Sequence, residues 1–303
     1  MLTDGRLALA ETDEPAPDEG EVLVHVRAVS VNRGELHRLQ ARRTGWRPGW
    51  DFAGELVECG PAVRGFATGD RVFGTVPGGA WAERVAAPVG YVARLPETVS
   101  WAQGAALPVA GVTAMRVLSM AARPLAGARV LVTGAAGGVG RLAVQLAAAA
   151  SARVTAVVGS AERAHGLAAL GAHEVTIGLD QIHGGFDLVL ESVGGDSLAR
   201  ALSLVEPAGV VVTFGNSSRA ETRFRAEDFY YAEAALRGYY FWRDLERRAP
   251  AEDLARLVAK VADGSLRLDI GECSSWEHLP EILERLRERR ITGKAVLLLG
   301  ADR

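Results

Sequence analysis

The sequence predicts an α/β protein in which a barrel-like β domain accompanies a doubly wound parallel sheet. Short β segments broken by glycine and proline occupy residues 21–96. Helices and apolar strands then alternate at βαβ spacing over residues 101–240. A glycine-rich turn at 134–140 separates a buried strand from a helix, as happens where a parallel sheet binds a phosphate group. These three observations define the expected fold class.

The first domain is expected over residues 1–100. Alternating apolar and polar residues predict a strand at 22–28, and two more strands at 54–59 and 71–75 follow turns. The second domain is expected over residues 101–245. Its apolar strands are predicted at 129–133, 153–158, 174–177, 187–191 and 209–214.

The last part of the chain, residues 246–303, resembles the first domain more than the second. Its pattern predicts a helix at 251–262, a short strand at 266–270, a helix at 279–289 and a final strand at 294–299. We therefore expect this segment to return to the β domain.

Composition argues against several classes of partner. A net charge of −3 gives no reason to expect a nucleic acid or a membrane partner, and no apolar run is long enough to span a bilayer. Residues 1–20 lack a basic region followed by an apolar core, so we expect no signal peptide and a cytoplasmic location. Cys59 and Cys273 lie far apart without a C-x-x-C companion, which argues against a disulfide framework or a structural zinc cluster.

The glycine turn predicts a dinucleotide site. Residues 135–140 fit G-x-G-x-x-G with alanine in the first glycine position. Gly137 would let the backbone approach the phosphates, and Gly140 would let the helix pack on the strand. The helix N-terminus, with Gly138 and Val139, offers free N–H groups to the pyrophosphate. A plain tight turn is the alternative, and the strand and helix on either side make it the weaker one.

The loop after the second strand favours NADPH over NADH. An acidic residue would hold the ribose hydroxyls of NAD at the tip of this strand, but the sequence there reads Gly-Ser-Ala-Glu-Arg from residue 159. Ser160 and Arg163 suit a 2′-phosphate, because guanidinium makes charge-assisted hydrogen bonds to phosphate oxygens. The alternative is that Ser160 caps a helix beginning near Ala161 and that Arg163 is a solvated charge.

Seven stretches in this order resemble the medium-chain dehydrogenase/reductase superfamily, and within it the zinc-independent quinone oxidoreductase, or zeta-crystallin-like, branch. They lie at 48–57, 69–73, 105–114, 132–140, 191–195, 214–216 and 292–297. The resemblance implies a GroES-like catalytic domain split around a Rossmann domain, with the active site in the cleft between them. It also implies a homodimer.

The departures from the zinc enzymes of this superfamily predict a protein without a catalytic metal. The segment that begins Gly-His-Glu in zinc alcohol dehydrogenases, with a ligand histidine, has Trp50 in that position here. Residues 30–37 hold no cysteine, and the four-cysteine structural lobe is missing. The histidines besides His37 lack ligand spacing, and we expect surface or core roles for His25, His165, His173, His183 and His278.

Without a metal, the hydride acceptor must be activated by conjugation and by hydrogen bonds to its carbonyl group. Quinones, enones and enoyl thioesters meet this requirement. The resemblance places Asn32 in the cleft, and His37 occupies about the position of a family tyrosine. The alternatives are that Asn32 forms a turn and that His37 is a partly exposed residue on a short helix beside Arg38.

Other expected site residues also come from the resemblance. Thr113 would contact the nicotinamide ribose or amide, although it could instead be part of a helix N-terminus. The predicted cofactor contacts further along the chain are Val193, Gly215, Asn216 and Lys294. A solvated lysine at a strand edge is the alternative for Lys294. The aromatic residues within 229–242 could line a substrate pocket, a subunit interface or the core.

The function that these observations favour is NADPH-dependent, metal-free reduction of a conjugated carbonyl compound, with a small-molecule substrate. One alternative is an enoyl reductase or reductive cyclase that acts on a natural-product intermediate of the polyketide type. Another is a non-catalytic protein that binds NADPH as a structural or regulatory module.

Overall fold

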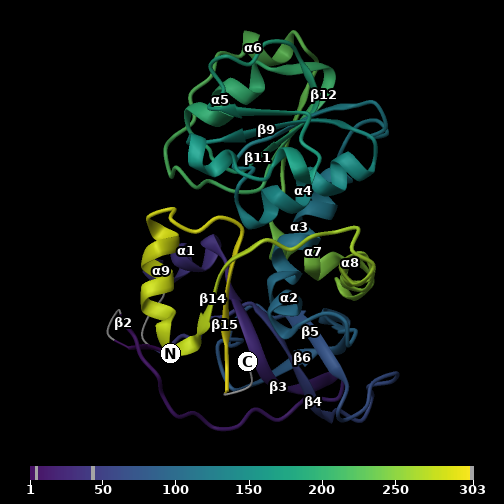
Figure 1. Cartoon of the computed structure of the whole chain (residues 1–303), viewed down its shortest axis with the longest axis vertical. Coiled ribbons are helices and arrows are strands. Elements are labelled where there is room, and N and C mark those ends of the chain that lie inside the picture. The colour runs from purple at the N-terminus through teal and green to yellow at the C-terminus, as the bar shows by residue number, and fades with distance from the viewer. Residues whose placement is uncertain (4–5, 42–44, 301–303) are drawn as a thin grey trace. The chain divides into compact units, whose positions relative to one another are not determined.

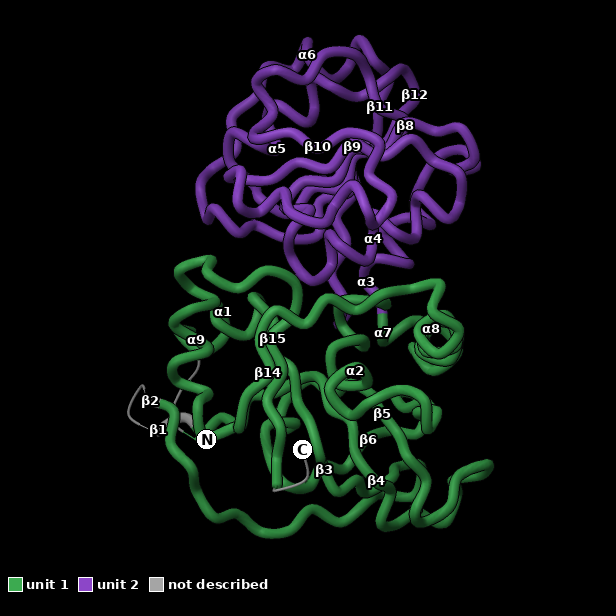
Figure 2. The backbone as a smooth tube through the Cα atoms, in the orientation of Figure 1, with its two compact units in different colours: residues 1–112, 245–303 green, residues 113–244 purple. Residues whose placement is uncertain are grey.

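The computed structural model describes residues 1–3, 6–41 and 45–300, and the chain forms two compact units (Figure 2). Unit 1 comprises Met1–Val112 and Leu245–Arg303, and unit 2 comprises Thr113–Asp244. The first boundary lies inside helix α3 (Pro108–Leu118), later than the expected boundary after residue 100. The reason is that α2 (Trp101–Ala106) packs against the strands of unit 1.

Unit 1 is built on a seven-stranded sheet (Figure 1). Its strands are β3 (Glu21–Val31), β4 (Asp51–Cys59), β5 (Arg71–Thr75), β6 (Arg84–Pro88), β7 (Val92–Arg94), β14 (Ile270–Ser275) and β15 (Lys294–Leu298). The order is β14-β15-β3-β4-β5-β7, and β6 also pairs with β3. β15 pairs antiparallel with β3, so the last strand of the chain belongs to the same sheet as the first long strand. A separate two-stranded sheet joins β1 (Leu2–Thr3) and β2 (Arg6–Leu7).

Helices cover this sheet. Besides α2, they are α1 (Arg33–Ala41), α8 (Ala251–Ala262) and α9 (Leu279–Arg287), and α1 packs on α9. Short 3₁₀ turns occur at Val89–Tyr91 and Trp276–His278. A capping box between Ser100 and Gln103 explains where α2 begins, since it satisfies backbone N–H groups that a helix start leaves unpaired.

The prediction of a strand at 266–270 is wrong. The alternating Leu-Arg-Leu-Asp-Ile pattern suggested a strand, but Leu266 is buried after the end of α8, and its N–H bonds to the carbonyl oxygen of Lys260. The strand forms at Ile270–Ser275 instead, because those residues meet β15 in parallel register. Long-range pairing, and not local alternation, selected the strand.

Unit 2 contains a six-stranded parallel sheet. Its strands are β8 (Arg129–Val132), β9 (Arg153–Val158), β10 (Glu174–Ile177), β11 (Phe186–Glu191), β12 (Val205–Thr213) and β13 (Ala235–Gly238). The order is β10-β9-β8-β11-β12-β13, so the chain reverses its direction of travel across the sheet between β8 and β11. In parallel sheets of this kind, ligands bind beyond the carboxyl ends of the strands at such a reversal.

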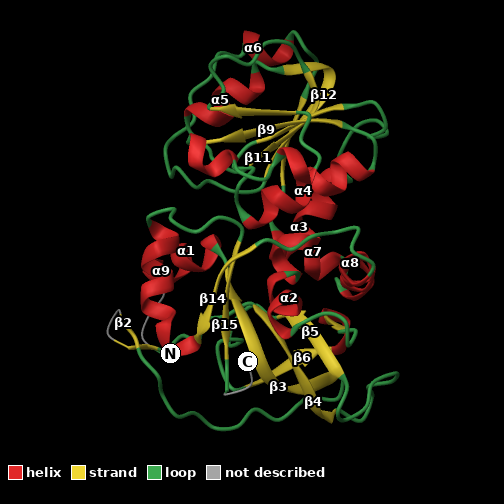
Figure 3. Ribbon diagram, viewed as in Figure 1, coloured by secondary structure: helices red, strands yellow, loops and turns green. Residues whose placement is uncertain are grey.

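Helices lie on this sheet as a doubly wound fold requires. α4 (Gly138–Ala149) packs on β8 and β9, and α5 (Asp196–Leu202) packs on β11 and β12 (Figure 3). The remaining helices are α6 (Glu227–Tyr230), α7 (Phe241–Arg247) and the 3₁₀ turns Ala161–Ala164 and Ala168–Leu170. None of the helices in the described ranges is long and apolar enough to cross a membrane.

Candidate active site

The glycine turn lies at the carboxyl end of β8, next to the point between β8 and β11 where the strand order changes direction. Gly137 is the N-cap of α4 and makes no side-chain cap, so the first N–H groups of α4, at Gly138, Val139 and Gly140, lack intrahelical partners. A Cβ atom on Gly140 would lie 2.6 Å from both the Cα atom of Ala135 and the carbonyl oxygen of Gly134. Only glycine therefore lets the helix start this close to the turn, and the turn fits a dinucleotide pyrophosphate.

Glu191, at the end of β11, holds the neighbouring loop in place. Its carboxylate is fully buried and accepts hydrogen bonds from Thr133 Oγ1 (3.1 Å), Ser197 Oγ (2.9 Å) and the N–H groups of Val193 (2.9 Å) and Gly194 (3.0 Å). Four donors satisfy the buried charge, which would otherwise be strongly destabilising. The loop after β11 is thereby fixed beside the end of β8.

The expected cofactor residues of the later strands lie on this same edge. Val193 is in the loop that Glu191 holds, and Gly215 and Asn216 follow β12. A Cβ atom on Gly215 would lie 3.1 Å from the carbonyl oxygen of Ser192, so the two loops are in close contact. The sheet brings these segments together because parallel strands present all their carboxyl ends on one edge.

The loop after β9 supplies the residues expected at the 2′-phosphate. Ser160 and Arg163 are both half-buried. The predicted helix here is only a 3₁₀ turn, and the Ser160 side chain makes no capping bond, so the capping alternative for Ser160 is not supported. A hydrogen bond from Ser160 instead lowers the pKa of the exposed Glu162 carboxyl. Thr113 is also part of unit 2 and is 5% exposed on α3.

Unit 1 contains a buried cluster around Lys294. The Lys294 ammonium lies 2.7 Å from Asn32 Oδ1 and 3.4 Å from Asp51 Oδ2. Asn32 Nδ2 in turn donates to Asp51 Oδ2 (2.8 Å) and to Glu35 Oε2 (3.4 Å). Lys294 is 5% exposed, so the alternative of a solvated lysine at a strand edge is wrong. The sequence analysis missed both carboxylates of this cluster.

A capping signal in the sequence could have found Glu35. Asn32 directly precedes α1, and Glu35 follows three residues later, which is capping-box spacing. The Glu35 carboxylate accepts the Asn32 backbone N–H at 2.7 Å, as the motif requires. The alternative for Asn32 was a turn-forming residue; in the structure it precedes α1, and its side chain joins the buried cluster.

The protonation of Glu35 is unusual. The pKa of its carboxyl group is raised to about 8, chiefly by burial and also by the nearby Asp51 carboxylate, while hydrogen bonds from Asn32 and the charge of Lys294 act in the opposite direction. Asp51 has a different environment, because it accepts from Ser30 Oγ (2.7 Å) and from the Val109 N–H (3.0 Å) as well as from Asn32 and Lys294.

His37 and Trp50 occupy the other expected positions. His37 is exposed on α1, where its alternative interpretation placed it, and its role stays a prediction. Trp50 is buried, and its ring lies so close to α1 that a Cβ atom on Gly34 would come within 2.7 Å of it. The Arg38 guanidinium lies over the same ring, 5.2 Å from its centre. The indole of Trp50 is thus packed between α1 and the Arg38 side chain and offers no metal-ligating atom.

Metal ligands do not cluster in the described part of the chain. Within it, no group of three or more histidine, cysteine, aspartate or glutamate side chains is arranged to hold a metal ion.

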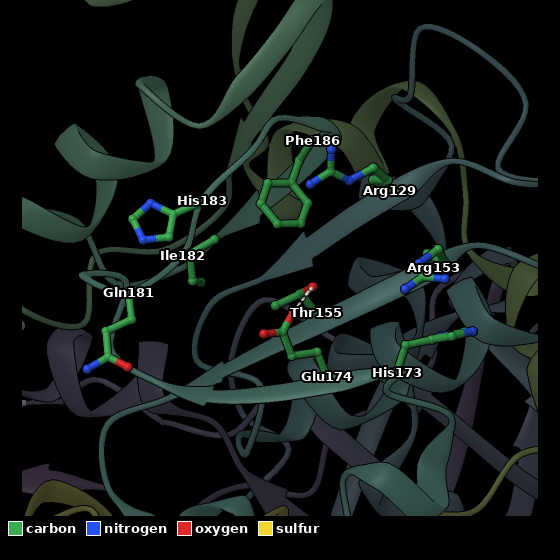
Figure 4. A pocket seen from close by; sticks show the side chains of 9 residues that line it. All are labelled: Arg129, Arg153, Thr155, His173, Glu174, Gln181, Ile182, His183 and Phe186. Carbon is green, nitrogen blue, oxygen red and sulfur yellow. Dashed lines mark hydrogen bonds between the residues drawn. The ribbon is translucent and has the colours of Figure 1, made fainter.

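A small pocket of about 120 Å³ lies elsewhere in unit 2, near the amino-terminal ends of β8 to β11 (Figure 4). It is lined by Arg129, Arg153, Thr155, His173, Glu174, Gln181, Ile182, His183 and Phe186. No expected site residue is among them. The pocket therefore lies at the opposite end of the strands from the glycine turn.

Comparison with known proteins identifies the family. A model of the alcohol dehydrogenase GroES-like domain matches residues 18–97, and a model described as zinc-binding dehydrogenase matches residues 138–260. A quinone oxidoreductase from Lama guanicoe is 33% identical over 94% of this chain and 91% of its own length. The chain belongs to the medium-chain dehydrogenase/reductase superfamily, in its quinone oxidoreductase branch. As a member of this branch it is an oxidoreductase.

Two further comparisons bear on the fold and on the branch. The structure of the quinone oxidoreductase from Coxiella burnetii has a TM-score of 0.85 and 26% sequence identity, and the match covers 97% of this chain and 95% of that one. The expected GroES-like and Rossmann architecture is thus confirmed. A segment of the erythronolide synthase EryA2 of Saccharopolyspora erythraea is 36% identical over 94% of this chain but only 8% of that protein.

Proposed function

We propose that this protein is an NADPH-dependent oxidoreductase that reduces a conjugated carbonyl compound, such as a quinone, an enone or an enoyl group, without a metal ion. The observation that carries the proposal is the glycine turn after β8, where the strand order of the unit 2 sheet changes direction. The N–H groups at the start of α4, which have no intrahelical partners, fit a pyrophosphate. The Lama guanicoe relative supports the class of acceptor.

The chain's own residues would hold the cofactor as follows. The N–H groups of Gly138, Val139 and Gly140 bind the pyrophosphate, and Ser160 with Arg163 binds the 2′-phosphate. NADPH supplies the hydride when it is bound. The nicotinamide end of the cofactor is proposed to be positioned by Val193, Gly215, Asn216 and Thr113.

The test of NADPH preference is Arg163→Ala. Loss of a charge-assisted contact to the 2′-phosphate should raise KM for NADPH about tenfold or more and leave KM for NADH unchanged. Equal effects on both cofactors would contradict the assignment.

The cofactor contact expected of Lys294 stays a prediction. We propose in addition that the Lys294 cluster stabilises negative charge on the oxygen of the reduced acceptor. Both donor positions of the Asn32 amide face carboxylates, and its oxygen accepts from Lys294. Asn32 therefore orients the ammonium, which gives two of its three N–H groups to Asn32 and Asp51 and keeps one to donate to an oxyanion. His37, on α1, is a second proposed donor, since an imidazole ring N–H can donate a hydrogen bond to an oxygen.

The decisive assay follows NADPH oxidation by absorbance, with and without a strong chelator, against a quinone, an enone, an enoyl thioester and a simple aldehyde. Chelator-insensitive reduction of the conjugated acceptors, but not of the aldehyde, is expected. Aldehyde reduction that is lost with the chelator would refute the metal-free mechanism.

A second candidate is an enoyl reductase or reductive cyclase for a polyketide-type intermediate. The similarity to a segment of EryA2 favours it specifically. Product analysis separates the two, because a cyclised or saturated thioester product would support this candidate, and quinone reduction with no thioester turnover would exclude it.

We also propose a cytoplasmic homodimer. β13 forms one end of the unit 2 sheet, and Leu236 on this strand and Tyr240 just after it are 40% and 59% exposed. An apolar sheet edge of this kind is suited to pairing with a second copy. Light scattering at several concentrations should give the mass of two chains, and a monomer at all of them would refute the dimer.

A further inference from the structure

Glu35 is a fully buried carboxyl group that the chemistry proposed above does not use. Its side chain is 0% exposed, and Oε1 has no hydrogen-bond partner among the described residues. Among the residues that the structure describes, Oε2 accepts from Asn32 alone, through the backbone N–H at 2.7 Å and Nδ2 at 3.4 Å. Because a buried carboxylate needs donors on its oxygens, the charged form of this group is poorly supported here.

Asp51 is the contrasting carboxylate in the same cluster. Four donors surround it, from Ser30, Asn32, Val109 and Lys294. The single ammonium of the cluster is therefore already offset by a buried anion whose oxygens have donors. A second negative charge on Glu35 would have neither donors on Oε1 nor a cation of its own.

We propose that Glu35 carries a proton at neutral pH and that, as a neutral group, it holds Asn32 in place while leaving the cluster around Lys294 with no net charge. This rests on the proposed function, in which that cluster stabilises negative charge on the reduced acceptor. Glu35 is thus a positioning residue that acts through Asn32 and Lys294. The pKa of Glu35, raised to about 8 chiefly by burial, agrees with this assignment.

The charged groups around Glu35 define what it responds to. From the packed strands, Asp51 on β4 and Lys294 on β15 act on its charge. The other ionisable side chains on α1 and on the adjoining α9 are exposed or have other partners. Those of His37, Glu281, Glu284 and Arg287 are exposed. Arg33 donates to a carbonyl oxygen of α9, Arg38 donates to the carbonyl oxygen of Pro77, and Arg285 pairs with Glu272.

Ionisation of Glu35 should oppose the reaction. Above pH 8 the cluster acquires a net negative charge, which repels the charge that develops on the acceptor oxygen. The value of kcat/KM should then fall about tenfold per pH unit, as it does when one ionisation inactivates an enzyme. Glu35→Gln keeps a carbonyl oxygen for Asn32 but cannot ionise, so this alkaline decline should disappear in the variant.

The experiment has one readout that does not depend on turnover. Infrared spectra of the wild-type protein are recorded as the pH is raised through 8, and a protonated carboxyl band should be lost in that range. The band should be missing in Glu35→Gln and present in the matched control Glu55→Gln, whose target is a half-exposed glutamate paired with Arg27. Kinetic pH profiles with a quinone are measured on the same three proteins.

Each outcome decides a different point. A wild-type spectrum without a protonated carboxyl band at neutral pH overturns the proposal, and this test needs no variant. A band that titrates, together with the same alkaline decline in wild type and Glu35→Gln, overturns the role in the reaction. If no acceptor is reduced, the proposed function fails, while the infrared titration still decides the charge of Glu35.

Discussion

Replacement of Lys294 by methionine should destabilise unit 1 through the buried pair with Asp51. Methionine keeps most of the apolar length of lysine and removes the charge. The ammonium lies 3.4 Å from Asp51 Oδ2, and the two side chains are 6% and 0% exposed. The variant leaves the Asp51 carboxylate without its cation and Asn32 Oδ1 without its donor.

The magnitude can be worked from these contacts. At an effective dielectric constant of about 20, unit charges at the Lys294–Asp51 separation attract by about 5 kcal/mol. Removal of one partner from a buried pair costs about 3–5 kcal/mol. Asp51 keeps three other donors, from Ser30, Asn32 and Val109, so we expect the lower end, about 3 kcal/mol.

Urea unfolding followed by tryptophan fluorescence measures this change. Five of the six tryptophans belong to unit 1, so the signal reports chiefly on the unit that contains the pair. The matched control is Lys260→Met on α8, because Lys260 and Lys294 are the two lysines of the chain. Lys260 is only half-buried, so the control should change the unfolding free energy by less, about 0.5 kcal/mol or below.

A double-mutant cycle with Asp51→Asn isolates the pair. If the Lys294–Asp51 pair stabilises the fold, Lys294→Met should lower the free energy of unfolding by less in the Asp51→Asn background than in the wild type. A loss below about 0.5 kcal/mol in Lys294→Met, or equal losses in both backgrounds, would refute the reasoning.

Three further predictions concern the cofactor edge and the buried carboxyl. Gly140→Ala should weaken NADPH binding at least about tenfold by calorimetry, since its Cβ meets backbone, whereas Gly159→Ala, with open space around its Cβ, should not. Glu191→Gln should lower the free energy of unfolding by about 2 kcal/mol, because the amide NH₂ would face the N–H donor of Gly194. Hydrogen exchange in the loop after β11 should become faster in this variant. The control Glu206→Gln, at a half-exposed residue, should leave exchange in that loop unchanged. For Glu35, whose folded pKa of about 8 exceeds its usual 4.5, the folded state binds the extra proton between these values. The unfolding free energy should therefore fall as pH rises from 4.5 to 8, by at most on the order of 5 kcal/mol, and Glu35→Gln should lack this slope.

The cofactor edge was largely predictable because its signals are local. A buried strand, a glycine turn and a helix lie within 129–149, although the helix begins at Gly138, inside the expected turn at 134–140. Helix α8 was also predicted at its observed bounds, since its apolar periodicity is unbroken. The short strand β14 was misplaced, because its position depends on pairing with β15 and not on its own alternation.

The Lys294 cluster shows the limit of sequence reasoning. Asn32 and Lys294 were selected by resemblance, but Glu35 and Asp51 were not, because burial of a carboxyl group is a property of everything packed around it. The residues of the cluster are separated by up to 262 positions along the chain. Only the pairing of β15 with β3 brings Lys294 beside the start of α1.

The sequence by itself determined the fold class, the dinucleotide turn and the absence of a histidine at Trp50, since each is written in contiguous residues whose spacing has a direct physical meaning. The tertiary structure alone decided that Lys294 is buried rather than solvated, that Asn32 faces two carboxylates, and that Glu35 lies in a setting that favours its neutral form. Charge states and hydrogen-bond partners depend on desolvation and on distances of a few ångströms, and both are set by contacts between segments that are remote in sequence.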